Sequence, residues 1–124
     1  MRFITVEFEF KSDRLLSELV EALEQAGFDF NHAGPWKGAF LHSCQLAEPL
    51  EGAEAEVSYF LDCLEHFAYE VQEAFRSAGE KVADIGYSRD RSKDEFCQRL
   101  MLSLPLMKRM VEWDLTMALS VYKE

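Results

Sequence analysis

The chain has 124 residues, of which 48% are hydrophobic and 29% are charged, and this length and composition predict one globular domain spanning residues 1–124. With 23 acids against 13 bases the net charge is −10, which argues against the basic face that binding to nucleic acid or an anionic membrane requires. No apolar run approaches the roughly 18 residues of a membrane span, and no cysteine lies in a C-x-x-C motif. Together with acids among the first ten residues, where a signal peptide would be apolar, this predicts a cytoplasmic protein.

Two periodicities divide the chain into elements. Alternating apolar and polar residues indicate half-buried strands, whereas apolar residues three and four positions apart indicate helices that bury one side. In chain order we expect a strand at 4–10, a helix at 15–26, a loop at 28–38, a strand at 39–46, a helix at 54–78, strands at 82–87 and 95–102, a helix at 103–112 and a strand at 115–121. Ser103 is the predicted cap of the last helix, and Pro105 lies in its first turn.

The predicted order of elements is β-α-β-α-β-β-α-β. Strands that alternate, rather than reading apolar throughout, imply a sheet covered on one face only. We therefore predict the α+β class, with a mainly antiparallel sheet of about five strands, two long helices on one face and a short C-terminal helix. The charged run at 88–94 is the expected tip of a hairpin between the strands at 82–87 and 95–102.

Catalytic signatures are missing from the sequence. It contains no G-x-S-x-G, H-E-x-x-H, G-x-x-x-x-G-K or G-x-G-x-x-G motif. Cys97 lies in a predicted strand, without the helix N-terminus that would activate a thiol. Asp62, His66 and Glu70 are four residues apart, a spacing that can place metal ligands on one helix face, but we interpret them as a solvated face. We expect no catalytic residue, no metal and no cofactor.

Aromatic residues crowd into the predicted loop at 28–38 and its continuation, among them Phe28, Phe30, Trp36 and Phe40. One interpretation is that the loop folds back and closes the end of the core, because large aromatic side chains dominate core burial. The other is an apolar pocket with Trp36 as its wall. The second interpretation gives an alternative function, a small-ligand-binding or regulatory domain.

Charge is distributed unevenly along the chain. Residues 1–75 hold 15 acids and four bases, a net charge of −11, whereas residues 76–124 hold eight acids and nine bases, a net charge of +1. Between Gly38 and Phe75 there is no Lys or Arg, although a helix normally gains stability from opposite charges four residues apart. The excess serves either solubility or an acidic surface for a basic partner.

Two runs near the C-terminus, LSLPLMKRM at 102–110 and LTMALSVY at 115–122, carry a resemblance to a known family. They resemble the ending of a bacterial domain-of-unknown-function family of small single-domain α+β proteins, which shows a short Ser-Pro-capped helix and then an alternating strand ending in Tyr. The Lys37-Gly38 step before the second strand and the long central helix are similar as well. Some members lie near toxin genes, so the resemblance implies an immunity role.

Charge and resemblance together lead to a functional expectation. We expect a non-enzymatic protein-binding module, most specifically an immunity or inhibitor protein that neutralises a basic bacterial toxin domain, because toxins that attack nucleic acids have basic clefts. No nucleic-acid or membrane partner is expected, and the oligomeric state is left open. The predicted contact residues lie on the helix at 54–78 and are Glu54, Glu56, Asp62, Glu65, Tyr69, Glu70 and Glu73.

Overall fold

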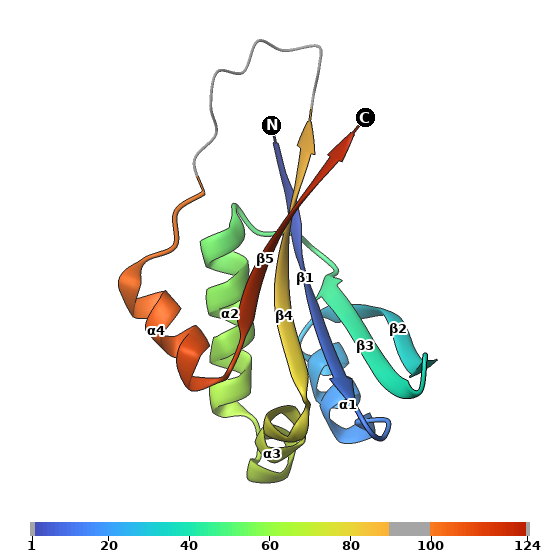
Figure 1. Ribbon diagram of the computed structural model, residues 1–124. Helices are drawn as coiled ribbons and strands as arrows, with labels where there is room; N and C mark the ends of the chain where they lie inside the picture. The colour runs from blue at the N-terminus through green and yellow to red at the C-terminus, as the bar shows by residue number, and fades with distance from the viewer. Residues whose placement is uncertain (1, 90–99, 124) are drawn as a thin grey trace.

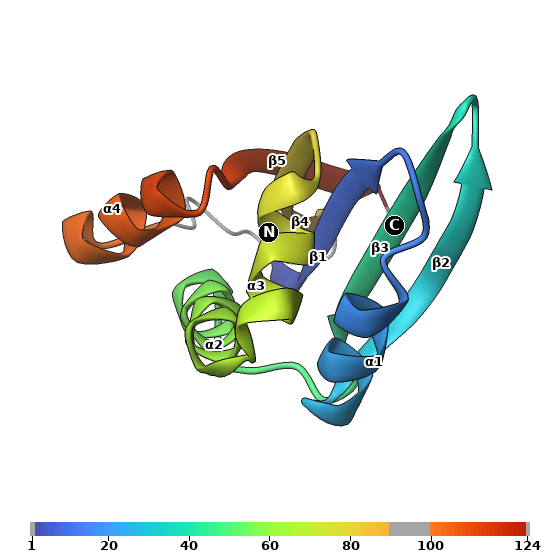
Figure 2. The same cartoon turned by 90° about the horizontal axis from the view of Figure 1, so that it is seen from below.

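A computed structural model describes residues 2–89 and 100–123, with side chains for 2–88 and 100–122. Its five strands form one sheet in the order β2-β3-β1-β4-β5, and the helices lie on one side of that sheet (Figures 1 and 2). In chain order the elements are β1 (Arg2–Ser12), α1 (Ser17–Gln25), β2 (Phe28–Trp36), β3 (Ala39–Leu46), α2 (Ala53–His66), α3 (Tyr69–Ser77), β4 (Glu80–Arg89), α4 (Leu104–Glu112) and β5 (Thr116–Lys123).

The sheet is mainly antiparallel, and the predicted α+β class is confirmed. Strand β1 pairs antiparallel with both β3 and β4, and β2 pairs antiparallel with β3. Only β5 runs parallel to its neighbour, β4. The cap of α4 is confirmed as well, because the Ser103 hydroxyl accepts a hydrogen bond from the backbone N–H of Leu106.

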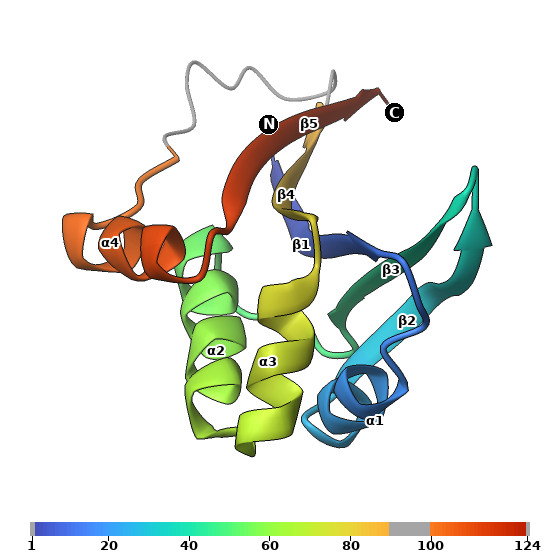
Figure 3. The ribbon, with the colours of Figure 1, turned by 60° about the horizontal axis from the view of Figure 1, so that its bottom comes forward.

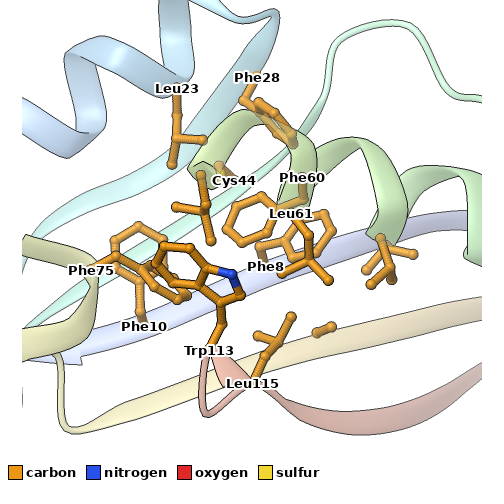
Figure 4. Close-up of a cluster of buried hydrophobic side chains, with 14 of the residues drawn as sticks. Phe8, Phe10, Leu23, Phe28, Cys44, Phe60, Leu61, Phe75, Trp113 and Leu115 are labelled. Carbon is orange, nitrogen blue, oxygen red and sulfur yellow. The ribbon is translucent and has the colours of Figure 1, made fainter. Parts of the chain in front are cut away.

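The core lies between the sheet and α2, and its centre is aromatic (Figure 4). The ring of Phe60 on α2 stacks on that of Phe8 on β1, with 4.0 Å between ring centroids and 7° between ring planes. Phe28 and Phe75 meet Phe60 edge to face, at 5.6 and 5.7 Å. Because Phe8 and Phe28 come from two strands and Phe60 and Phe75 from two helices, the cluster holds both layers together.

The predicted loop at 28–38 is wrong, because most of this segment is strand β2. The pairing of β2 with β3 is irregular between Phe30 and His32. This interrupts the alternation of apolar and polar residues that would have identified the strand in the sequence. Gly34 and Pro35 belong to an edge strand, where a missing N–H is tolerated. The actual turn is Lys37-Gly38, whose positive φ angles of 48° and 83° are those of a two-residue hairpin turn.

The predicted helix at 54–78 is in fact two helices, α2 and α3. Phe67 and Ala68 between them have extended backbone, with ψ angles of 157° and 153°. The Gln72 side chain donates hydrogen bonds to the carbonyls of Leu64 and Glu65 in the last turn of α2, where backbone donors become scarce. The break turns α3 back along α2 (Figure 3), so that Phe75 reaches the aromatic cluster.

Strand β4 pairs with β1 on one side and with β5 on the other. Residues 90–99, and most of the predicted hairpin tip with them, lie outside the described residues, and 100–102 are not in a strand. The apolar side of β5 also differs from expectation. The alternation at 115–121 predicts that Met117, Leu119 and Val121 form the buried side of this strand, but they are 46–53% exposed because β5 lies at the edge of the sheet.

A buried histidine takes part in starting α1. His42 on β3 is fully buried and stacks on Phe10. Its Nε2 accepts a hydrogen bond of 3.0 Å from the N–H of Leu16, so the ring proton is on Nδ1, which donates to the carbonyl of Phe10 at 3.1 Å. Burial lowers the pKa of His42, although the bond to Phe10 opposes this.

This environment predicts a pH dependence of stability. Because the neutral ring is favoured in the folded state, the contribution of His42 is complete above the ordinary histidine pKa of 6.5 and is lost as the pH falls below it. The His42 imidazole, followed by NMR, should titrate below pH 6.5, and the free energy of unfolding should begin to fall in the same range. Titration of this ring at or above pH 6.5 would contradict the assignment.

Candidate functional site

The acidic side of α2 faces another part of the same chain. The guanidinium of Arg109 on α4 lies 2.6 Å from a carboxylate oxygen of Asp62 and 2.8 Å from one of Glu65. Glu54 of α2 fixes the start of α4, because its carboxylate accepts a hydrogen bond from the backbone N–H of Ser103. Glu54, Asp62 and Glu65 therefore hold α4, and part of the charge that suggested an external partner is neutralised internally.

Glu56 is fully buried and cannot contact a partner as predicted. One carboxylate oxygen accepts hydrogen bonds from the Thr5 hydroxyl at 2.9 Å and from the N–H of Val6 at 2.7 Å. The other accepts from the N–H of Leu50 at 2.9 Å. These donors lie on β1 and on the segment leading into α2, so the Glu56 carboxylate joins three parts of the chain.

The remaining predicted contacts lie on α3. Tyr69 is 69% exposed, and Glu70 is exposed without a polar partner among the described side chains. Glu73 lies 3.6 Å from Arg76, a surface ion pair within one helix. The break between α2 and α3 also separates Glu70 from Asp62 and His66, which sequence spacing placed on one helix face. No group of three or more His, Cys, Asp or Glu within the described residues is placed to hold a metal ion.

A different acidic surface lies on the face of the sheet that the helices leave uncovered. Glu7 and Glu9 on β1 and Asp84 on β4 share this face, and Glu7 pairs directly with Asp84 across the two strands. We call these three residues the sheet-face acids. No Lys or Arg among the described residues forms an ion pair with any of them.

The sheet-face acids are held in place by hydroxyl groups. Ser43 on β3 donates a hydrogen bond of 2.6 Å to Glu7, and Ser120 on β5 donates to both oxygens of Asp84, at 2.8 and 3.0 Å. Partial burial raises the pKa of Glu9, and the neighbouring carboxylates of Glu7 and Asp84 raise it further. Like charges directly opposite on a sheet reduce stability, so this face has an electrostatic cost that the fold itself does not require.

Sequence reasoning missed this surface, although part of its signal was visible. The polar side of β1 carries two glutamates, but only the strand order shows that Asp84 joins them.

The aromatic segment does not gather into a loop around Trp36. Phe28 belongs to the core, whereas Trp36 lies beside the hairpin turn, 47% exposed, against His32 and Lys37. A cavity of about 410 Å³ lies elsewhere, lined by Ala26, Gly27, Leu46, Ala47, Glu48, Leu50 and Tyr59. The small-ligand alternative therefore loses the aromatic loop on which it was based.

The thiols have the features of structural residues. Cys44 is fully buried in the core, and burial raises the pKa of its thiol well above the usual range. Burial also raises the pKa of Cys63, which is half-buried beside Tyr59. Neither group has the lowered pKa of a reactive cysteine. Cys97 lies outside the described residues.

Comparison with known proteins gave no match to a family model, to a curated protein or to a solved structure. The resemblance of 102–110 and 115–122 to a family of unknown function therefore stays a prediction. Among the described helices, none has the length and apolar character needed to cross a membrane.

The buried carboxylate of Glu56 gives a direct stability test. Glu56→Ala leaves the buried N–H of Val6 and the partly buried N–H of Leu50 without an acceptor. The buried group alone costs about 1–3 kcal/mol, so the free energy of unfolding should fall by at least about 1 kcal/mol. The free energy of unfolding of Glu56→Gln should fall less, because one side-chain oxygen remains to accept a hydrogen bond. Glu51→Ala, an exposed neighbour, is the control and should change stability by less than about 0.5 kcal/mol. Urea unfolding measures all three, and equal effects of Glu56→Ala and Glu51→Ala would rule out the assigned role.

Proposed function

We propose that this protein is a non-enzymatic protein-binding module that recognises a basic partner through the sheet-face acids, Glu7, Glu9 and Asp84. The observation that carries the proposal is the electrostatic repulsion among these carboxylates, which lowers the stability of the fold. Three carboxylates lie together, and no Lys or Arg among the described side chains forms an ion pair with them. Burial and the carboxylates of Glu7 and Asp84 raise the pKa of Glu9, although Lys11 on the same strand opposes this. A basic partner would remove this electrostatic repulsion on binding, and its association would be accelerated by the field of a chain with net charge −10.

In its most specific form, the proposal is that the protein is an immunity-type inhibitor that neutralises a basic, nucleic-acid-targeting bacterial toxin domain. An acidic surface can occupy the same basic cleft as the phosphates of the substrate. The family resemblance points in the same direction. We place the protein in the cytoplasm, where the free thiols of Cys44 and Cys63 would stay reduced.

Tyr69 and Glu70 on α3 form a second, smaller candidate contact. Both are exposed, and neither takes part in holding α4. Among the predicted contact residues, Glu54, Glu56, Asp62 and Glu65 have partners within the fold. Tyr69 and Glu70 therefore stay available for contact with another protein.

The test compares two sets of charge changes with the same effect on net charge. The sheet-face variant is Glu7→Gln, Glu9→Gln and Asp84→Asn, and the control is Glu21→Gln, Glu24→Gln and Glu112→Gln, all exposed positions on α1 and α4. Each set removes three negative charges. The wild-type protein is immobilised and used to capture a partner from a lysate of its own organism, and association of the captured partner is then measured at low and at physiological salt.

The captured partner should be basic, and its association should be slower by about tenfold or more with the sheet-face variant while the control stays close to wild type. The salt dependence of association should shrink in parallel. A third variant, Tyr69→Ala with Glu70→Gln, reports on the α3 contact. If the protein is an immunity-type inhibitor, expression of the captured partner alone should arrest growth, and co-expression of this protein with that partner should restore it. Equal association by wild type and the sheet-face variant would refute the proposal.

A further inference from the structure

The two edges of the sheet are built differently. Strand β2 at one edge carries Asp29 and Pro35 and an irregular pairing, which are features that prevent another strand from adding to an edge. Strand β5 at the other edge has no Gly or Pro, and its one charged residue is Lys123 at its end, because residues 115–122 contain no charge. An edge strand of this length that is rich in apolar residues and charged only at its last residue is a template for pairing with another chain.

Apolar side chains continue from β5 onto α4. Leu106 and Met110 bury one side of that helix, but Leu104 and Val111 are 78% and 79% exposed. Met107 lies on the same stripe and lines a shallow cavity together with Met117 of β5, which makes the two elements one surface. We call it the α4–β5 surface, and its exposed members are Met101, Leu104, Met107, Val111, Met117, Leu119 and Val121.

The size of this surface matches that of an interface. Scaled by their exposed fractions of 39–79%, seven such side chains present on the order of 700–800 Å², close to the roughly 800 Å² that each partner buries in a standard complex. The largest apolar patch on a typical monomer is about 300–600 Å².

Charge indicates what covers it. Residues 100–122, which form α4 and most of β5, hold two bases, Lys108 and Arg109, and two acids, Glu112 and Asp114, so this segment of the chain has no net charge. The whole chain has a net charge of −10, and two copies therefore meet with least repulsion here. A basic partner, in contrast, gains nothing from a neutral surface.

We propose that the α4–β5 surface is the interface of a symmetric dimer, in which β5 pairs antiparallel with β5 of a second copy. About a twofold axis at Leu119, Leu119 lies opposite Leu119 of the second copy, and Met117 lies opposite Val121 of the second copy. Side chains opposite each other in such a pair point to the same face, so apolar residues meet apolar residues. The two five-stranded sheets join into one of ten strands.

Helix α4 fits this arrangement. It projects past the β5 edge of the sheet (Figures 2 and 3), and β5 begins shortly after the helix ends. In an antiparallel pair, the start of β5 lies beside the end of the second copy's strand. The exposed stripe of Leu104, Met107 and Val111 therefore extends over the second copy, which explains why an amphipathic helix keeps these residues apolar on its outer side.

The experiment is sedimentation equilibrium of the full chain from low to high micromolar concentration. The wild type should approach twice the chain mass of 14.3 kDa. Leu119→Lys places two like charges at the axis and should weaken the dimer by about tenfold or more. Val111→Glu on α4 is a second variant at a more exposed position, and it decides the question if Leu119→Lys fails to fold by circular dichroism.

The matched control is Trp36→Lys, a comparably exposed aromatic residue at the opposite edge, where the dimer should be unaffected. A wild type that stays monomeric at every concentration would overturn the proposal. So would a dimer that survives both Val111→Glu and a folded Leu119→Lys, or one that Trp36→Lys dissociates equally. Association into species larger than a dimer would also overturn it, because antiparallel pairing of one edge closes after two copies.

Discussion

The carboxylate of Glu56 sets the position of the helical layer on the sheet. Strand β3 pairs with β1 over Phe8–Ser12, so the N–H of Val6 lies beyond that pairing and needs another acceptor. Glu56 supplies it from α2 and fixes the entry segment through Leu50 at the same time. Phe60 follows Glu56 by four residues and therefore lies on the same side of α2, where it stacks on Phe8. The polar contact of Glu56 and the aromatic stack of Phe60 therefore hold the same side of α2 on β1.

The acids of the chain have two different uses. On α2 they act inside the fold, where Glu56 accepts from buried donors and Asp62 and Glu65 hold Arg109. On the uncovered face of the sheet, Glu7, Glu9 and Asp84 form no ion pair with a Lys or Arg of the described part of the chain, and burial together with the neighbouring carboxylates raises the pKa of Glu9. Surface ion pairs contribute little in general, but here one guanidinium bridges two carboxylates and adds to the apolar contacts of Leu106 and Met110 that hold α4 on the body.

Much of the fold could be predicted because its signals are local. Alternation identified β1 and β4, and Ser103 with Pro105 marked the start of α4. The predictions that were wrong depend on contacts between residues far apart in the sequence. No Gly or Pro marks the break at Phe67, since Gln72 stabilises it from the next helix. The acids of α2 look alike in the sequence, and only packing shows that Glu56 is buried, or that Arg109, more than forty residues away, faces Asp62. For the same reason the sequence could not join Asp84 to Glu7.

The central claim is that the acids of α2 stabilise the fold, whereas the sheet-face acids oppose it. Urea unfolding at pH 7 tests this with two variants. The first combines Asp62→Asn and Glu65→Gln, and the second combines Glu7→Gln, Glu9→Gln and Asp84→Asn. The first pair should lower the free energy of unfolding by about 0.5–2 kcal/mol, because Arg109 loses both partners. The second set should raise it by about 0.2–1 kcal/mol, because like charges no longer face each other. Changes of the same sign in both sets would contradict the account.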